Sequence, residues 1–133
     1  MIKPLKISVR FRDCDMMGHV NNAVYLSYFE QARMHYFKEM VGKDWDYKKH
    51  GMILVHNEIT YLKPIFLNDS PEISLYLVKV GTKSFTFGYE IRVDNEVVTT
   101  GKSKLVCYDF KENKSVPVHP ELINAFDKLS KEP

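Results

Sequence analysis

The sequence predicts one α+β domain in which a single long helix lies against an antiparallel sheet. Apolar residues recur at helical spacing from Asn22 to Val41, whereas Ile73 to Tyr108 mostly alternates between apolar and polar residues, as strands do. A chain of 133 residues is long enough for one hydrophobic core. The order of one strand, one long helix and then a run of strands is typical of the α+β class.

The first half of the chain predicts one strand before the long helix and one strand after it in the sequence. Lys6 to Arg12 reads as a short half-buried strand, because its apolar residues alternate. The helix presents one apolar face and has Gly42 as a plausible C-cap; that face contains Tyr25, Tyr28, Phe29, Ala32, Tyr36 and Met40. Met52 to Tyr61 is strand-like, and Pro64 after it indicates an edge strand or a strand end.

The second half predicts an antiparallel run of strands followed by a last helix. Turn residues at 68–71 precede one alternating segment, and turn residues at 81–82 separate it from a second. The inward positions are Ile73, Leu75 and Leu77 in the first segment and Phe85, Phe87, Tyr89, Ile91 and Val93 in the second. Asp94-Asn95 fits a two-residue hairpin turn, from which Glu96 to Tyr108 returns. After a turn at 111–114, Pro120 begins a short helix with Leu122, Ile123, Phe126 and Leu129 on one face.

Composition and charge exclude several classes of protein. Lys and Arg number 19 and Asp and Glu 17, so the net charge of +2 gives little support to nucleic-acid binding. No apolar run approaches the ~20 residues that cross a bilayer, and the charged N-terminus does not resemble a secretory signal. Two cysteines without a C-x-x-C pair agree with a reducing compartment. We therefore expect a cytoplasmic protein.

One segment, Asp13 to Asn22, concentrates the reactive side chains and lies between the first strand and the long helix. Gly18 permits a tight turn, and the start of the helix near Asn21 or Asn22 offers unpaired N–H groups that can polarise an acyl carbonyl oxygen. A carboxylate opposite those amides can act as a nucleophile or as a general base on water. The competing interpretation is that Asp, Gly and Asn only form the turn and cap the helix.

Other chemistries have less support in the sequence. Acidic neighbours on both sides of Cys14 disfavour a thiolate nucleophile, so a buried structural cysteine is the better interpretation. Asp13, Asp15 and His19 have no second cluster of ligands to complete a metal site. The motifs of serine hydrolases, phosphate-binding loops and dinucleotide-binding folds are absent. We expect neither a metal nor another cofactor.

Three segments together resemble the hotdog-fold acyl-CoA thioesterases of the 4-hydroxybenzoyl-CoA thioesterase family. Residues 9–33, V-R-F-R-D-C-D-M-M-G-H-V-N-N-A-V-Y-L-S-Y-F-E-Q-A-R, are similar to the family's strand, D-x-D-x-x-G loop and F-E-x-A-R helix. I-T-Y-L-K-P at 59–64 and K-V-G-T-K-S-F at 79–85 resemble its second strand and the turn into its fourth. The likeness covers nearly the whole chain.

The resemblance implies a hotdog fold over residues 1–133, an antiparallel sheet wrapped around one long central helix, with a short C-terminal helix in this chain. It also implies a homodimer or homotetramer with active sites at the subunit interface. The family's catalytic carboxylate matches Asp15, and the amide that holds the thioester oxygen maps near Asn22. Some members carry a histidine where this chain has Asn22.

The leading hypothesis is an acyl-CoA thioesterase that forms a free acid and CoA, with Asp15, Asn22 and Gly18 as catalytic positions. Its substrate-binding candidates in this segment are His19, Asn21 and Tyr25. The alternatives are a thioesterase acting on acyl carrier protein and a non-catalytic hotdog protein that binds acyl groups. A further candidate site is the turn of Lys79, Thr82, Lys83 and Ser84, where backbone amides, hydroxyls and lysines could grip the CoA phosphates; the competing interpretation is an ordinary hairpin with solvated lysines.

Overall fold

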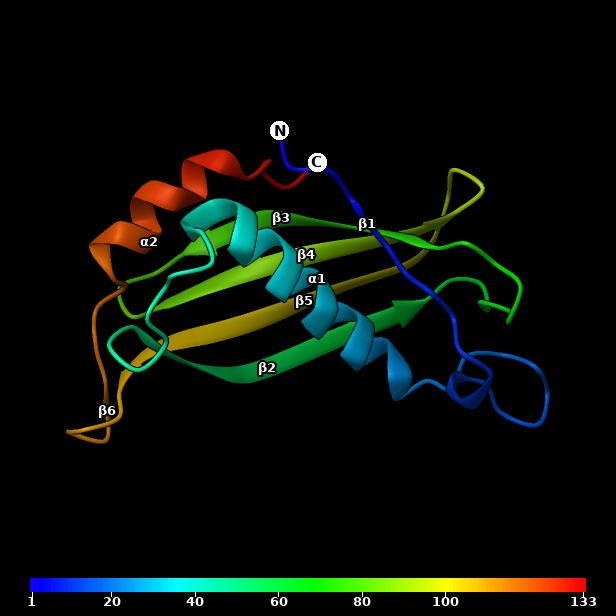
Figure 1. Cartoon of the computed structure of the whole chain (residues 1–133), viewed down its shortest axis with the longest axis horizontal. Helices are drawn as coiled ribbons and strands as arrows, with labels where there is room; N and C mark the ends of the chain where they lie inside the picture. Colours follow the sequence, from blue (N-terminus) through cyan, green and yellow to red (C-terminus); the bar gives the residue numbers. More distant parts are fainter.

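The computed structural model describes residues 1–133 and contains one antiparallel sheet with a long helix across it (Figure 1). The elements are β1 (Leu5–Lys6), the 3₁₀ turn η1 (Phe11–Asp13), α1 (Val24–Val41), β2 (Gly51–Tyr61), β3 (Glu72–Val80), β4 (Ser84–Val93), β5 (Glu96–Asp109), β6 (Lys114–Ser115), α2 (Pro120–Ala125) and η2 (Phe126–Lys128). The sheet order is β1-β3-β4-β5-β2, and β6 pairs with β5. The predicted α+β class, long helix and short C-terminal helix are confirmed.

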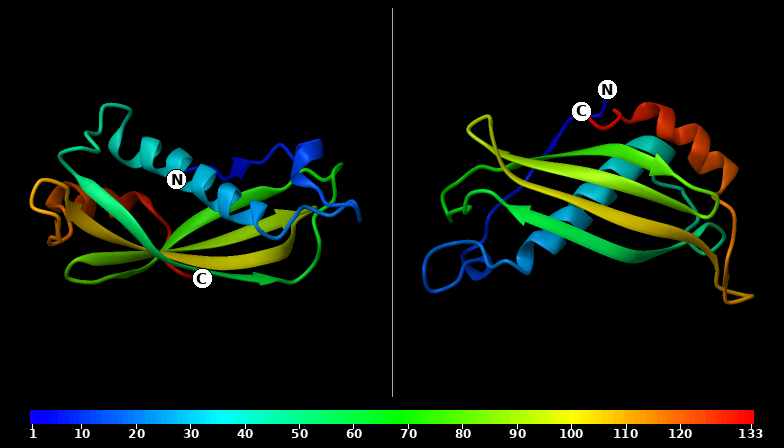
Figure 2. Two further views of the ribbon diagram at one scale, coloured as in Figure 1. Left: turned by 90° about the horizontal axis from the view of Figure 1, so that it is seen from below. Right: turned by 180° about the vertical axis from the view of Figure 1, so that it is seen from behind.

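The core lies between α1 and one face of the sheet. The inward residues of β4, namely Phe85, Phe87, Tyr89 and Ile91, are completely buried, and all six residues predicted for the apolar face of α1 are buried as well. Figure 2 shows that no helix covers the opposite face of the sheet. Each large side chain buried in this way stabilises the fold by roughly 1.5–3 kcal/mol, so the seating of α1 on the sheet is a major source of stability.

Several turns adopt the backbone conformations that their residues predict. Asp94 and Asn95 both have positive φ, at 51° and 66°, which is the geometry of a type I′ hairpin turn. Gly42 ends α1 with φ 83°, and its N–H donates to the Lys38 carbonyl. Strand β2 forms an edge of the sheet and ends at Tyr61, as Pro64 predicts.

The predicted strand at Lys6 to Arg12 is wrong beyond its first residue. β1 stops at Lys6 because its partner β3 begins at Glu72, and the last contact in this direction is the Ile7 N–H to the Pro71 carbonyl. The chain then turns at η1, where the Asp13 carboxylate accepts hydrogen bonds from the Arg10 amide and guanidinium. Phe11, one of the alternating apolar residues of the predicted half-buried strand, is 84% exposed.

The last helix also departs from its predicted face. Leu122, Phe126 and Leu129 are buried, but Ile123 is 46% exposed. The buried face of α2 extends from Leu122 toward Ala125, which is also buried, and Ile123 lies about 100° around the helix from Leu122 on the other side. None of the helices is both long and apolar enough to span a bilayer.

Candidate active site

The loop between η1 and α1 is held in shape by the backbone of Asp15. Its N–H donates to the His19 carbonyl at 2.8 Å, and its own carbonyl accepts the Gly18 N–H at 3.1 Å. Gly18 has φ 82°, a conformation in which L side chains are strained. The predicted tight turn at Gly18 is therefore present, and it projects Asp15 from a closed loop.

The Asp15 carboxylate is exposed but oriented. Its Oδ1 accepts hydrogen bonds from the Met17 N–H at 2.9 Å and the His19 N–H at 3.3 Å. Both amides bind the same oxygen, so Oδ2 has no partner within the chain. A carboxylate fixed at one oxygen and free at the other suits a general base or a nucleophile.

Asp13 has a different environment from Asp15. Its side chain is buried and accepts hydrogen bonds from the Arg10 N–H and the Tyr28 hydroxyl, both at 2.9 Å. Burial raises the pKa of Asp13, but the Arg10 amide, the Tyr28 hydroxyl and the Arg10 guanidinium outweigh burial and hold that pKa below its usual value. Burial and Asp13 in turn raise the pKa of Tyr28. These contacts tie the loop to α1.

The start of α1 leaves backbone amides free, among them that of Asn22. The Asn21 side chain accepts the Ala23 N–H at 2.9 Å, and the Asn21 carbonyl accepts the Val24 N–H. The N–H of Asn22 has no acceptor in the chain, while its carbonyl accepts the Tyr61 hydroxyl at 2.9 Å. Asn21, predicted to contact substrate, is thus occupied with the helix start, and Asn22 keeps an N–H for a ligand.

A pocket of about 490 Å³ brings four of the predicted site residues together. Asp15, His19, Asn22 and Tyr25 line it with five residues that the sequence analysis did not assign to the site: Val20, Tyr61, Leu62, Lys63 and Pro64. The Tyr25 ring is buried against Tyr61 at 4.8 Å between ring centroids, and the His19 ring packs on Phe66 at 4.9 Å. Burial raises the pKa of Tyr25. The pocket combines a carboxylate and a free amide with aromatic walls.

Tyr61 and Lys63 were missed because only tertiary structure brings the end of β2 beside the Asp15 loop. The sequence signals in this segment were Pro64, which marked the end of a strand, and the likeness of residues 59–64 to the family's second strand; neither pointed to a place in the site. Lys63 forms an exposed ion pair with Glu96 at 2.7 Å. The expectation of a buried Cys14 was wrong, since Cys14 is half-buried; Cys107 is the buried cysteine, and burial raises its pKa.

The turn of Lys79 to Ser84 lies at the other end of the sheet. Ser84 pairs with Val106 of β5, whereas Tyr61 pairs with Thr99. These two positions are seven residues apart on one strand, which is about 23 Å at ~3.3 Å per residue. Lys79, Thr82 and Lys83 are exposed, and neither lysine forms an ion pair. One protomer therefore does not bring this turn to Asp15.

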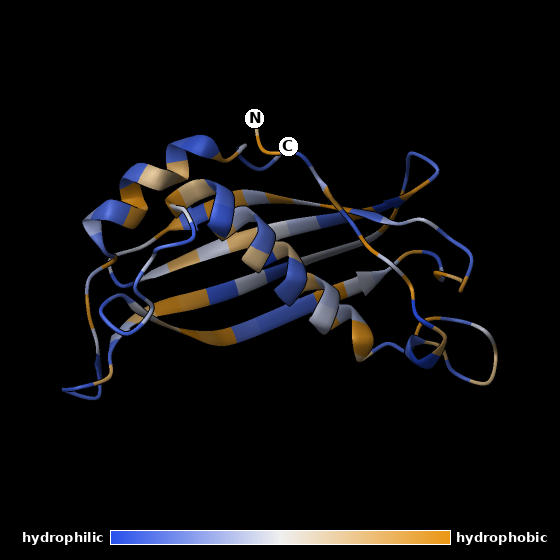
Figure 3. Cartoon of the chain, viewed as in Figure 1, coloured by the Kyte–Doolittle hydropathy of each residue, from blue (hydrophilic) through white to orange (hydrophobic).

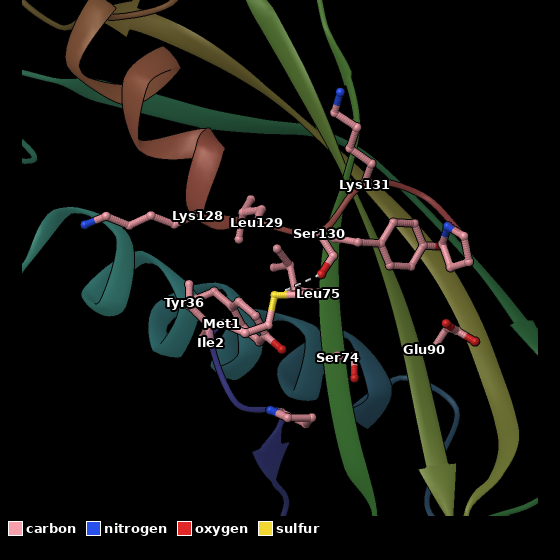
Figure 4. A pocket seen from close by; sticks show the side chains of 13 residues that line it. Met1, Ile2, Tyr36, Ser74, Leu75, Glu90, Lys128, Leu129, Ser130 and Lys131 are labelled. Carbon is pink, nitrogen blue, oxygen red and sulfur yellow. Dashed lines mark hydrogen bonds between the residues drawn. The ribbon is translucent and has the colours of Figure 1, made fainter.

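A separate hollow of about 320 Å³ lies between the two chain ends, α1 and β3 (Figure 4). Its wall includes Met1, Tyr36, Glu90 and the segment from Lys128 to Lys131, and the Ser130 hydroxyl donates to the Met1 sulfur. The C-terminal segment also pairs with β3 through the bridge of Lys131 to Leu77. None of the predicted site residues lines this hollow.

Comparison with known proteins identifies the family of this chain. A model of the thioesterase-like superfamily matches residues 9–126. The chain is 29% identical over 129 residues to the long-chain acyl-CoA thioesterase FadM of Escherichia coli, covering 95% of this chain and 98% of FadM. It is 30% identical over 112 residues to the uncharacterized protein YsmA of Bacillus subtilis, covering 84% and 76% of the two chains.

Solved structures of thioesterases are also similar to this chain. A Thermus thermophilus thioesterase complexed with coenzyme A and Zn is 32% identical and superposes with a TM-score of 0.82 over 92% of this chain and 95% of that one. A predicted thioesterase from Bacillus stearothermophilus, at 22% identity, shares the fold with a TM-score of 0.88 over 98% and 97%. The resemblance to thioesterases is confirmed, and this chain belongs to the thioesterase-like superfamily.

Proposed function

We propose that this protein is an acyl-CoA thioesterase that uses Asp15 and the Asn22 amide. The observation that carries the proposal is their common position in one open pocket, with Oδ2 of Asp15 and the N–H of Asn22 both free of partners in the chain. Membership of the superfamily supports the thioester chemistry. The names of FadM and of the coenzyme A complex support CoA as the carrier.

The chemistry follows from those two groups. The Asn22 N–H donates a hydrogen bond to the thioester carbonyl oxygen and stabilises the negative charge that develops there. Asp15 either takes a proton from water as the water attacks the carbonyl carbon, or attacks that carbon itself and forms an anhydride that water opens. The C–S bond breaks, the thiolate of CoA leaves, and the acyl group departs as the free acid. Gly18 contributes the turn that holds Asp15 in place.

The walls of the pocket suit an apolar acyl group close to the thioester. Tyr25, Tyr61 and Leu62 provide apolar surface, and His19 stands at the rim against Phe66. Tyr61 also fixes the start of α1 through its hydrogen bond to the Asn22 carbonyl. We assign Tyr61 a positioning role, because this bond orients the peptide unit next to the free amide.

We propose a homodimer, alone or within a tetramer, as the working unit. Strand β2 is an unpaired edge that exposes Leu54 and Val55, and an edge of this kind favours pairing with another strand. Antiparallel pairing of two β2 strands brings the turn of Lys79 to Ser84 of one protomer toward the Asp15 pocket of the other. This arrangement, and not a single chain, lets that turn hold the CoA phosphates. The two free cysteines agree with our proposal of a cytoplasmic location.

A substrate panel tests the proposal. Thiol release is measured with short, long and aromatic acyl-CoA thioesters and with matched acyl groups on acyl carrier protein. We expect hydrolysis of at least one acyl-CoA, at a higher kcat/KM than its acyl-carrier counterpart. Faster hydrolysis of the thioester on acyl carrier protein would show that acyl carrier protein, and not CoA, is the preferred carrier. Binding of acyl groups without any thiol release would identify a non-catalytic protein and contradict the proposal.

A further inference from the structure

Lys63 is the only lysine or arginine among the residues that line the Asp15 pocket. Its ammonium group pairs with the Glu96 carboxylate at 2.7 Å, and both side chains are more than half exposed. An ion pair surrounded by water contributes little free energy, so its two members exchange readily with other ions. The pocket therefore contains a cation that an anionic ligand can recruit.

The backbone fixes Lys63 at the rim of this pocket. The amides of Leu62 and Lys63 both donate to the Val98 carbonyl, at 2.9 and 3.1 Å. These two bonds follow the regular pairing of β2 with β5, which ends at Tyr61, and they hold the chain just before Pro64. Lys63 thus has an anchored backbone and a side chain that is free to change its ionic partner.

Glu96 keeps the Lys63 ammonium on the same side of the sheet as the Asp15 loop. Glu96 is opposite Val93, which packs against the core, so Glu96 lies on the face that carries α1. The hairpin between β4 and β5, the end of β2 and the Asp15 loop all lie at one end of the molecule (Figure 1). That hairpin is hydrophilic (Figure 3), so water reaches the ion pair.

Hydrolysis of a thioester changes the charge of the ligand in the pocket. The carbonyl of the substrate is neutral, whereas the released acid is a carboxylate at neutral pH. This anion forms beside the Asp15 carboxylate, and two carboxylates in one site repel each other. Lys63 is the ammonium group of the pocket that offsets the repulsion. A cation at this place therefore acts on the product and not on the neutral reacting group of the substrate.

We propose that Lys63 is a product-binding residue: its ammonium group leaves Glu96 and pairs with the carboxylate of the released acid, so that Glu96 limits inhibition of the protein by its own product. The inference rests on the proposed function and adds a regulation of the same site. While the pocket holds no acid, Glu96 occupies the cation. When the acid accumulates, it competes with Glu96 for Lys63 and keeps the next acyl-CoA out of the pocket.

Inhibition of thiol release by the free acid tests the proposal. Lys63→Met keeps the length of the side chain and removes its charge, so the inhibition constant of the acid should rise ~3- to 5-fold, the upper range for an ion pair exposed to water. Glu96→Gln frees Lys63 and should lower the inhibition constant. KM for acyl-CoA should change by less than about 2-fold in both variants, because the thioester carbonyl is neutral. Both side chains are exposed, so the urea midpoints should stay at the wild-type value.

Lys102→Met is the matched control. Lys102 also pairs with a glutamate, Glu132, at 3.6 Å, but its neighbour Gly101 faces α1, so Lys102 faces away from the helix and the pocket. Its substitution should leave the inhibition constant unchanged. No change in Lys63→Met, or an equal rise in both lysine variants, would overturn the proposal. An increase in KM as large as the increase in the inhibition constant would show that Lys63 acts on CoA itself, and would overturn it as well.

Calorimetric titration with octanoate and with benzoate separates this inference from the thioesterase proposal. We expect the wild-type protein to bind at least one of the two acids, with a dissociation constant that rises in Lys63→Met and falls in Glu96→Gln. This pattern without any thiol release would contradict the thioesterase proposal and leave the carboxylate site in place. Thiol release without binding of either acid, or with binding that neither substitution changes, would overturn the inference alone.

Discussion

Two aspartates separated by one residue have opposite environments in this protein. Asp13 is buried among three hydrogen-bond donors, whereas Asp15 is exposed and held by backbone amides at a single oxygen. Two identical side chains can have different roles when one is buried and hydrogen-bonded and the other is exposed to water. Asp13 therefore belongs to the fold and Asp15 to the proposed chemistry.

Asp13→Asn should destabilise the protein more than Asp15→Asn does. The substitution weakens charge-assisted hydrogen bonds in a buried site, and we expect the free energy of unfolding to fall by about 1.5–3 kcal/mol. Asp15→Asn, in an exposed loop, should change it by less than ~0.5 kcal/mol. Urea denaturation of both variants measures the difference. A larger loss for Asp15→Asn would contradict the assignment of roles.

The pKa of Asp13 predicts a dependence of stability on pH. Because the folded-state pKa is lowered, its contribution is fully present above the ordinary value of 3.8 and is lost as the pH falls through the folded-state pKa. The wild-type urea midpoint should decrease between pH 5 and pH 2, and Asp13→Asn should show a shallower decrease. Parallel pH curves for the two proteins would show that Asp13 contributes no pH-dependent stability.

The reactive loop could be recognised from sequence because its chemistry is local. Asp15, Gly18 and Asn22 lie within eight residues, and a glycine with positive φ and a helix start are features of adjacent residues. Tyr61 could not be recognised, since its contact with Asn22 depends on how the end of β2 packs against a loop 39 residues earlier. Long-range packing of this kind leaves no periodic signal in the chain.

At the scale of elements, the same difference between local and long-range determinants separates the correctly predicted β4 strand from the wrongly predicted first strand. The bounds and inward face of β4 follow from strict alternation, and the turn at Asp94-Asn95 follows from residues that tolerate positive φ. The strand predicted at Lys6 to Arg12 alternates equally well but ends at Lys6, because the neighbouring strand does not extend far enough to pair with it. Alternation predicts which side chains of a strand face the core, whereas the length of the strand depends on how far its neighbouring strand extends.

The packing of α1 on the sheet depends on a glycine in β5. A Cβ added at Gly101 would lie 2.5 Å from ring carbons of Phe29 and 2.7 Å from the Glu58 carbonyl oxygen. Phe29 is completely buried and stacks on Tyr89 with a centroid separation of 4.0 Å, so it has no free space into which to move. Gly101 allows the helix to approach the sheet closely at this point.

Gly101→Ala should therefore lower the free energy of unfolding by about 1–3 kcal/mol, the cost of overpacking a filled core. Gly81→Ala is the control, because its nearest atom is the Ser84 hydroxyl at 3.1 Å, on a side chain that can rotate. Thermal or urea denaturation of the two variants checks the contrast. Equal stability of Gly101→Ala and wild type would show that α1 is not seated as described.

At the scale of the whole molecule, the Asp15 pocket and the turn of Lys79 to Ser84 lie at opposite ends of the sheet in one chain. The proposed phosphate contact by this turn therefore belongs to the proposed dimer. Lys83→Ala should raise KM for acyl-CoA and change kcat little, since a phosphate contact acts on the ground state and the transition state alike. A short acyl thioester without the nucleotide provides the control, and its hydrolysis should be unaffected. If Lys83→Ala slows the short substrate as much as acyl-CoA, the lysine does not act on phosphate.

The most direct measurement compares thiol release from acyl-CoA by the wild-type protein and by Asp15→Asn, after sedimentation shows that both have the same assembly state. Asp15→Asn keeps the size of the side chain and removes the charge that activates water or attacks carbon. We predict that kcat/KM falls by ~10²-fold or more, the lower range of what general-base catalysis contributes. Retention of wild-type kcat/KM by a folded, equally assembled Asp15→Asn protein would contradict the account.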